Sequence, residues 1–250
     1  MALAMIESNG IICLAPPDVG GVAFTSRVGG SSPDPYRSLN LSSASADNPD
    51  LVQGNRRAVG AALGITGDWI TPRQVHGTTV LDTRRLKSSG GAKADAVVGS
   101  GAGRPIAVMA ADCLPIALKG EGAYAAVHAG WRGLCSGIID AAVESLRNSL
   151  GDLRAWIGPS IGPCHFETGP EVAAAFSMRY PSAPDFGLRV GRAQHFNLWA
   201  AARWVLVHLG VGVGDEDPAC THCDASMYFS YRRDGLTGRQ ALIVWEGENK

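Results

Sequence analysis

The stretch PIAVMAADCLPIAL, residues 105–118, carries the strongest structural signal in the chain. Apolar residues fill it almost completely, which is typical of buried strand. Asp112 and Cys113 interrupt the run. Because a carboxylate is costly to bury without a partner, we expect Asp112 to be paired, hydrogen-bonded or placed at a strand end facing a cleft.

Segments on both sides of this stretch predict helices and strands in a mixed order. Extended segments are expected at 69–82, 124–128, 154–157, 227–231 and 240–245. Helices are expected from 49 to 63, from about 134 to a stop at Gly151, from 171 to 178, and from an N-cap at Asn197. The strict strand–helix alternation of a doubly wound sheet is missing. We therefore predict a mixed-sheet α/β or α+β fold.

Composition limits the possible classes of function. The 250 residues carry a formal net charge of −1, whereas a nucleic-acid binder typically has an excess of basic residues. No apolar run reaches the roughly 20 residues that span a bilayer, and the first residues contain Glu7 and no basic segment, unlike a signal peptide. We expect a cytoplasmic protein without nucleic-acid or membrane partners. In a reducing compartment its six cysteines should be free, metal-bound or catalytic.

Three short segments place a metal donor beside a small or turning residue. They are QVHG (74–77), ADCL (111–114) and HAGWRG (128–133). His76, Cys113 and His128 would give one thiolate and two imidazoles, the set of a catalytic zinc with one open position. Taken singly, each histidine also fits a structural role and Cys113 fits a small buried apolar residue. Asp112 would orient one of these metal ligands by contacting the ligand, without binding the metal itself.

Two further groups are open to more than one interpretation. Cys220 and Cys223 form a C-x-x-C pair, but no second such pair exists to complete a zinc site. A structural role, or one cysteine near the active site, is therefore expected rather than a separate metal site. Arg27, Arg232, Arg233 and Arg239 lie in glycine-rich contexts, where arginine suits bidentate binding of phosphate or carboxylate, although for any one of them taken singly a solvated surface is the favoured explanation.

Taken together, these segments resemble the laccase-domain family, also called YfiH-like or multicopper polyphenol oxidase-like. The resemblance runs from about residue 22 to 245. Its other matching stretches are Ser26-Arg27 with Gly29-Gly30, Ser38-Leu39-Asn40-Leu41, Asn55-Arg56, Gly158-Pro159 with Ile161 to Cys164, and Phe229 to Gly235 with Thr237 to Arg239.

The resemblance implies a zinc-dependent purine nucleoside enzyme with an α+β fold: a single layered domain over 1–250, with mixed β-sheets flanked by helices. Zinc would be held at the positions of His76, Cys113 and His128. The implied reactions are phosphorolysis of adenosine, inosine and S-methyl-5'-thioadenosine, and deamination of adenosine. Catalytic roles fall to the three zinc-site residues and Asp112, and substrate contacts to Arg27, Asn40, Gln74, Arg232, Arg239 and Cys223. Nucleosides and phosphate are the expected partners, with the chain a monomer or weak homodimer.

Three other functions remain open at this point. Copper is the alternative metal, because a His₂Cys set also suits a blue-copper site, with Met109 as an axial ligand. The six histidines are too few for a multicopper oxidase. Cys113 and His128 would also serve a cysteine hydrolase as nucleophile and base. A non-catalytic role in peptidoglycan editing is the third.

Overall fold

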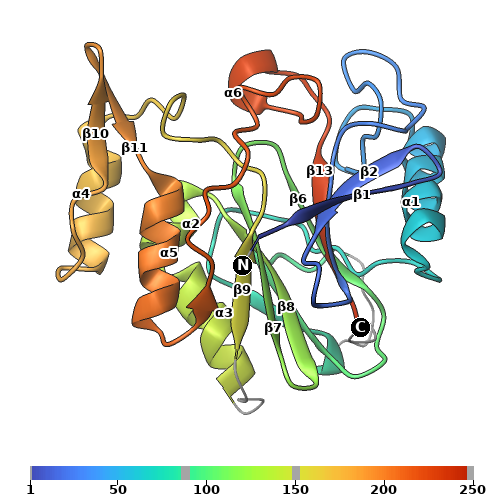
Figure 1. Ribbon diagram of the computed structural model, residues 1–250, viewed down its shortest axis with the longest axis horizontal. Helices are drawn as coiled ribbons and strands as arrows, with labels where there is room; N and C mark the ends of the chain where they lie inside the picture. The colour runs from blue at the N-terminus through green and yellow to red at the C-terminus, as the bar shows by residue number, and fades with distance from the viewer. Residues whose placement is uncertain (1, 86–90, 148–152, 247–250) are drawn as a thin grey trace.

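Two β-sheets packed face to face form the centre of the molecule, with helices on the two outer sides (Figure 1). The computed structural model describes residues 2–85, 91–147 and 153–246. The first sheet is antiparallel and has the order β1-β2-β3-β13-β6. Its strands are β1 (Ala4–Ser8), β2 (Ile11–Ala15), β3 (Val22–Thr25), β6 (Ile106–Ala110) and β13 (Gln240–Val244).

The second sheet is mixed and has the order β12-β9-β7-β8-β5-β4. Its edge pairs β4–β5 and β12–β9 are parallel, and its central pairs are antiparallel. Its strands are β4 (Val80–Asp82), β5 (Ala96–Ser100), β7 (Leu114–Gly120), β8 (Ala123–Ala129), β9 (Arg154–Ile157) and β12 (Gly212–Val213). A separate hairpin joins β10 (Gly187–Val190) to β11 (Ala193–Phe196).

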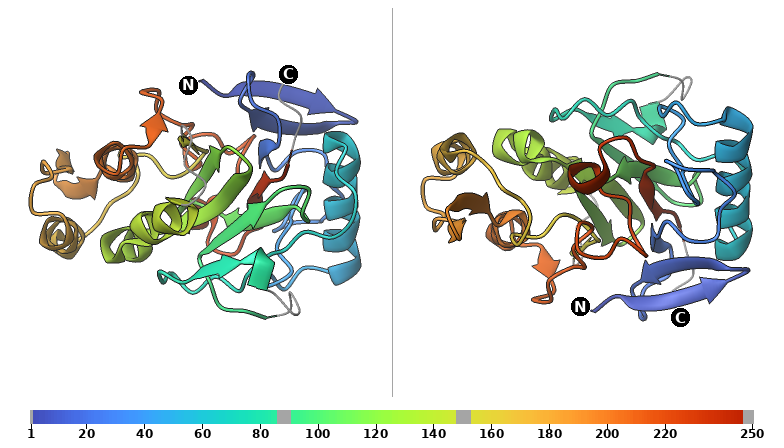
Figure 2. Two further views of the ribbon diagram at one scale, coloured as in Figure 1. Left: turned by 90° about the horizontal axis from the view of Figure 1, so that it is seen from below. Right: turned by 90° about the horizontal axis from the view of Figure 1, so that it is seen from above.

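Helices cover the outer faces of both sheets, as the two views of Figure 2 show. On the side of the first sheet lies α1 (Pro49–Leu63). On the side of the second lie α2 (Trp131–Ser136), α3 (Ile138–Leu146), α4 (Pro170–Arg179) and α5 (Leu198–His208). The short α6 (Tyr231–Asp234) lies at one end of the sheets, and the 3-10 turn η1 (Thr83–Arg85) follows β4.

The central strands are apolar over most of their length because both of their faces are buried. On β6, Ile106 and Val108 pack between the two sheets, whereas Ala107 and Met109 pack toward α1. Strand β8 alternates in the same way, with Tyr124 and Ala126 between the sheets and the residues on either side facing the other helices. Because successive side chains point to opposite faces, a strand in a middle layer favours apolar residues at every position except near its ends. The run 105–118 is apolar for this reason.

The predicted α+β architecture with mixed sheets and flanking helices is confirmed. Helix α1 has the expected bounds, with Asn48 as N-cap and Gly64 in the left-handed conformation at its end. The N-cap of α5 is Asn197, as expected. None of the described helices is long and apolar enough to cross a membrane.

Three element predictions were wrong. Only Val80–Asp82 of the expected extended segment 69–82 is a strand, with single bridges at Ile70 and Arg73. The helix expected from 134 is two helices, because Gly137 has a φ of 93° and ends α2 before α3 begins; its expected stop at Gly151 lies outside the described residues. The expected strand 227–231 runs instead into α6, which Ser230 caps through its side chain.

Candidate active site

The structure brings together the three side chains proposed as metal donors, His76, Cys113 and His128. Each comes from a different segment: the loop before β4, the turn between β6 and β7, and the end of β8. One ligand atom from each lies within 4.8 Å of the others. Cys113 Sγ lies 3.8 Å from His76 Nε2, and the two imidazole rings meet edge-on with centroids 4.9 Å apart.

Unusual backbone geometry allows this convergence. His76 and Asp112 have φ values of 59° and 94°, in the left-handed region that non-glycine residues rarely adopt. Gly130 lies between the donors, where a Cβ would be 2.8 Å from His76 Cδ2 and 3.1 Å from Cys113 Sγ. Strained positions cluster at functional sites, where the surrounding structure holds them in place. Here the two left-handed residues lie in the turns that direct His76 and Cys113 toward one point.

The buried carboxylate of Asp95 holds the side chain of His128 and the backbone around His76. One of its oxygens, Oδ1, lies 3.0 Å from His128 Nδ1. The carboxylate also accepts the backbone N–H groups of Val75, His76 and Gly77, the last two at 2.9 and 2.7 Å. By holding Nδ1, Asp95 leaves Nε2 of His128 as the metal-binding atom, the arrangement that orients ligand histidines in metal sites.

Charge distribution in the set favours a thiolate. Burial opposes ionisation of Cys113, but the charge and hydrogen bonds of the two histidines overcome it and lower its thiol pKa from 9.0 to about 6. Burial likewise opposes protonation of His128, yet Cys113 and Asp95 raise its pKa to about 9. Burial would raise the pKa of Asp95, but its hydrogen bonds lower it overall. A thiolate is the form of cysteine that binds metals or attacks as a nucleophile.

This donor set fits a transition-metal ion. Sulfur and nitrogen ligands around tetrahedral zinc are roughly 3.5 Å apart, close to the 3.8 Å between Cys113 and His76. Sulfur with two imidazoles is suited to zinc or copper, and three protein donors leave a position for substrate or water.

The donors open into a cleft of about 450 Å³. This volume lies within the roughly 300–1,000 Å³ of small-molecule sites. Besides the three donors, the described residues that line it include three arginines and one tyrosine: Arg56, Arg73, Arg239 and Tyr231. Loop residues 42–44, Thr71, Pro72, Gln74 and Met109 to Ala111 form the remaining wall. The cleft is therefore positively charged around a thiol and imidazole floor.

Two of the predicted site residues, Asp112 and Gln74, form hydrogen bonds that hold neighbouring segments in place and do not contact the donor side chains. The Asp112 carboxylate accepts Thr221 Oγ1 and the Arg232 N–H, both at 2.7 Å. It therefore ties a turn in place rather than contacting a donor imidazole, and Asp95 has the position expected of Asp112. Gln74 lines the cleft, but its amide pairs with the N–H and C=O of Met109 at 2.8 and 2.7 Å.

Of the remaining predicted residues, only Arg239 lines the cleft, where burial lowers its pKa and the charges of Cys113 and Asp112 partly restore it. Arg27 donates to the carbonyls of Arg37 and Ala225. Asn40 is fully buried and bonds Ser45, Asp47, Ser42 and Arg239 N. Arg232 donates to Glu167 O, and Cys223 lies in a different cluster with Cys164, His165 and Cys220.

Sequence reasoning missed Asp95, Arg56, Arg73 and Tyr231 as site residues. Asp95 carries the same signal as Asp112, because it directly precedes the wholly apolar start of β5. Tyr231 lies within a quoted motif, and 61% of it is exposed at the cleft. Arg56 also lies within a quoted motif, Asn55-Arg56, whereas no comparable signal marks Arg73.

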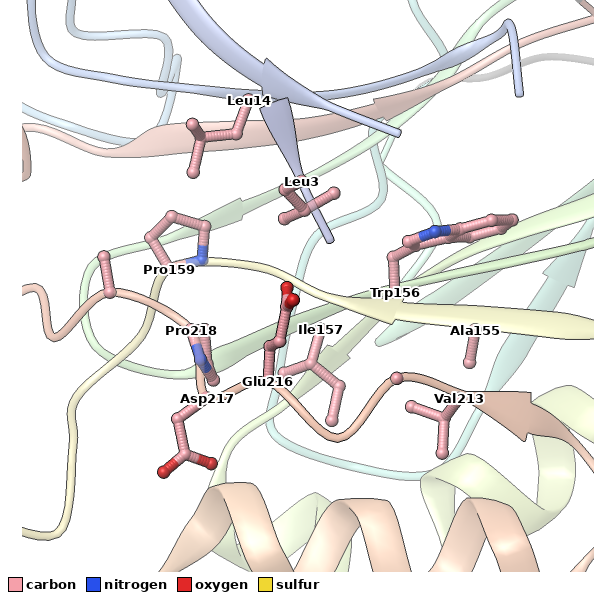
Figure 3. A pocket seen from close by; sticks show the side chains of 12 residues that line it. Leu3, Leu14, Ala155, Trp156, Ile157, Pro159, Val213, Glu216, Asp217 and Pro218 are labelled. Atoms are coloured by element: carbon pink, nitrogen blue, oxygen red, sulfur yellow. The ribbon is translucent and has the colours of Figure 1, made fainter. Parts of the chain in front are cut away.

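Two other hollows lack the chemistry of this cleft. One, of about 170 Å³, lies beside β9 and is lined by apolar residues with Glu216 and Asp217. Figure 3 shows the Glu216 carboxylate pointing toward it, an unsuitable wall for an anion. The other, of about 680 Å³, lies at α1 between Arg56, Arg57, Arg104 and Asp68 and contains no thiol or imidazole.

Known proteins share both the sequence and the fold. The model of the family described as multi-copper polyphenol oxidoreductase laccase matches residues 21–246. The Escherichia coli K12 protein named purine nucleoside phosphorylase YfiH is 38% identical, and the alignment covers 92% of this chain and 96% of that protein. The crystal structure of Neisseria meningitidis protein NMB0706 superposes with a TM-score of 0.82 at 34% identity, covering 94% of this chain and 98% of that one. YlmD from Geobacillus stearothermophilus gives 0.86 at 28% identity, covering 97% and 98%.

Proposed function

Because this chain belongs to the multi-copper polyphenol oxidoreductase laccase family, we propose that it is a zinc-dependent purine nucleoside phosphorylase. Relatives that match it over most of their length are named purine nucleoside phosphorylase. The substrates would be adenosine, inosine and S-methyl-5'-thioadenosine, with deamination of adenosine as a second reaction. The observation that carries the proposal is the convergence of His76, Cys113 and His128 beneath a cleft walled by arginines.

Phosphorolysis needs a site for a phosphate dianion beside the ribose. Arg56, Arg73 and Arg239 supply positive charge at the cleft wall. Nη1 of Arg239 donates to the Thr237 and Gly238 carbonyls at 2.9 Å, which fixes the guanidinium of Arg239. A guanidinium fixed at one nitrogen retains further N–H groups for two oxygens of a phosphate. Arg239 is therefore our choice for the principal phosphate contact, in place of Arg27.

The reaction exchanges one bond at the ribose for another. A phosphate oxygen attacks C1', the C1'–N9 bond breaks, and its electron pair leaves with the purine. The purine takes up the proton that hydrogenphosphate loses, which gives the free base and ribose 1-phosphate. Arg239 would hold the phosphate in line with C1' as positive charge develops there. The exposed ring of Tyr231 offers an aromatic face at the cleft for the purine.

His76, Cys113 and His128 would hold the zinc. When bound, zinc supplies a Lewis acid that polarises water or a substrate atom. The protein's own contribution is orientation: Asp95 fixes the ring of His128 and the N–H groups around His76. The left-handed turns then keep the two donors at the cleft floor.

The test is a product assay on metal-replete protein. With adenosine and phosphate we expect adenine and ribose 1-phosphate, and without phosphate no adenine. Inosine in the same chromatogram reports deamination. His128→Ala should abolish base release while the circular dichroism spectrum is retained. A folded, zinc-loaded wild-type protein that forms neither adenine nor inosine contradicts the proposal.

The low thiol pKa of Cys113 also favours a second candidate, a cysteine hydrolase with His128 as base. Alkylation separates the two functions. If Cys113 is a zinc ligand, stoichiometric zinc should protect it from iodoacetamide. If Cys113 is a nucleophile, zinc-loaded protein should be inactivated as fast as metal-free protein.

A further inference from the structure

A second cluster of metal donors lies where two loops meet, residues 158–166 and 219–224. It contains the thiols of Cys164, Cys220 and Cys223 and the imidazole of His165. The Cys164 sulfur lies 3.7 Å from that of Cys220 and 3.6 Å from that of Cys223. Nδ1 of His165 lies 3.3 Å from the sulfurs of both Cys164 and Cys223.

These separations match the edges of one tetrahedral shell. Zinc–sulfur bonds of about 2.3 Å and zinc–nitrogen bonds of about 2.0 Å put two sulfurs roughly 3.8 Å apart and sulfur and nitrogen roughly 3.5 Å apart. A disulfide would require about 2.05 Å between two sulfurs. The cluster therefore has the spacing of a metal shell and lacks the spacing of a disulfide.

The surroundings also have the character of a metal–thiolate site. The Gly162 N–H donates to the Cys220 sulfur at 3.2 Å, a bond that favours the thiolate. The ring of His222 stacks on that of His165 with centroids 3.9 Å apart, which orients the imidazole. Backbone hydrogen bonds between Ser160 and residues 219 and 221 hold the two loops side by side.

We propose that Cys164, His165, Cys220 and Cys223 bind a structural zinc ion. Three thiolates and one imidazole from the protein complete a tetrahedral shell and leave no position for a substrate, which is the character of structural zinc sites. The donors differ from those at the cleft, so this site is separate from the proposed catalytic one. The C-x-x-C pair supplies two of the four ligands, and the other two are Cys164 and His165, which lie 56 and 55 residues before Cys220 in the sequence.

The ion would hold the two loops that position Asp112. Thr221, beside Cys220, donates to the Asp112 side chain at 2.7 Å, and the Ile161 N–H donates to the Asp112 carbonyl at 2.9 Å. Asp112 adjoins Cys113 in the strained turn between β6 and β7. Joining residues 164–165 to 220–223 thus fixes the turn that presents Cys113 to the cleft.

Zinc content per chain, measured by elemental analysis after dialysis of the full-length protein, tests the proposal. Cys220→Ser and Cys164→Ser should each bind one zinc fewer than wild type. Cys135→Ser is the matched control, because Cys135 is a partly buried free thiol outside both sets, and it should keep the wild-type content. A Cys113→Ala protein should retain a zinc that Cys113→Ala/Cys220→Ser has lost.

A cobalt spectrum covers the case in which the serine variants fail to fold. In Cys113→Ala protein loaded with Co²⁺, sulfur-to-metal absorption should report three thiolates. His165→Cys keeps four donors and should raise that absorption by about one third. Three results would overturn the proposal: Cys113→Ala protein without any zinc, unchanged zinc content in Cys220→Ser, or an intact mass 2 Da low that maps to a Cys164 disulfide (about 1 Da per lost thiol hydrogen).

Discussion

Replacing Gly130 with alanine tests whether His76 and Cys113 act as paired metal ligands. The backbone at Gly130 has φ −69° and ψ 163°, which alanine adopts without strain. The new methyl group would be the only change, and it would lie 2.8 Å from His76 Cδ2 and 3.1 Å from Cys113 Sγ. Any effect therefore arises from steric displacement of the two donors.

The size of that displacement follows from contact distances. Carbon atoms meet comfortably at roughly 3.5 Å or more, so the His76 ring would have to move by about 0.7 Å. Metal–ligand distances tolerate only about 0.2 Å. We expect at least one ligand bond to be lost and zinc affinity to fall by about 100-fold or more, equivalent to about 2.7 kcal/mol.

Competition with a chromogenic chelator measures this affinity directly. Gly77→Ala is the matched control, because its Cβ would lie 3.6 Å from Asp95, an ordinary contact, in the same loop as His76. Gly77→Ala should keep wild-type affinity, and both variants should have similar urea midpoints in the metal-free state. Wild-type zinc affinity in Gly130→Ala, or an equal loss in Gly77→Ala, would refute the steric reasoning.

Three further predictions follow from individual contacts. Asp95→Asn removes the charge behind His128 and should weaken zinc binding by about 10- to 100-fold; the same chelator competition would show no change if Asp95 were merely structural. Arg239→Gln should raise the KM for phosphate by at least about tenfold in steady-state assays, with the KM for inosine little changed; equal rises in both would argue against a phosphate contact. Burial raises the pKa of Cys13 to about 12, so at pH 8 only about one thiol in ten thousand is ionised. Mass-spectrometric mapping after iodoacetamide treatment of metal-free protein should find Cys113, whose thiol pKa is about 6, modified and Cys13 intact, with Cys13 labelling rising about tenfold per pH unit; rapid Cys13 labelling at pH 8 would contradict this.

Local sequence signals predicted the elements whose cause is local. The N-cap and the left-handed glycine define both ends of α1 within the helix itself. The break at Gly137 was missed because the apolar positions on either side continue one helical periodicity, while Gly137 itself has a φ of 93°, and a Cβ there would lie 2.7 Å from the Arg179 guanidinium. The strand predicted at 227–231 failed for a similar reason, since the side-chain cap from Ser230 starts a helix there.

The donor set could be found from sequence because each donor lies at the end of a strand or in a turn beside one. The partners of those donors could not, since they depend on side-chain direction. Asp112 follows an apolar strand, as a ligand-orienting carboxylate would, but its φ of 94° sends the carboxylate to Thr221, 109 residues away in sequence. Asp95, which precedes an apolar strand, reaches His128 instead.

The arginine and asparagine motifs illustrate why polar residues in glycine-rich loops are ambiguous. Loops without regular hydrogen bonding leave backbone carbonyls and N–H groups that need partners. Arg27 and Arg232 donate to such carbonyls. Asn40 donates its amide N–H to Asp47 in its own loop and accepts the distant Arg239 N–H with its Oδ1. A guanidinium saturated by carbonyls has less capacity for an anion. Arg27 donates from all three of its guanidinium nitrogens, whereas the two carbonyl partners of Arg239 share one nitrogen, Nη1. This difference in hydrogen-bond use makes Arg239, rather than Arg27, the residue to test for phosphate.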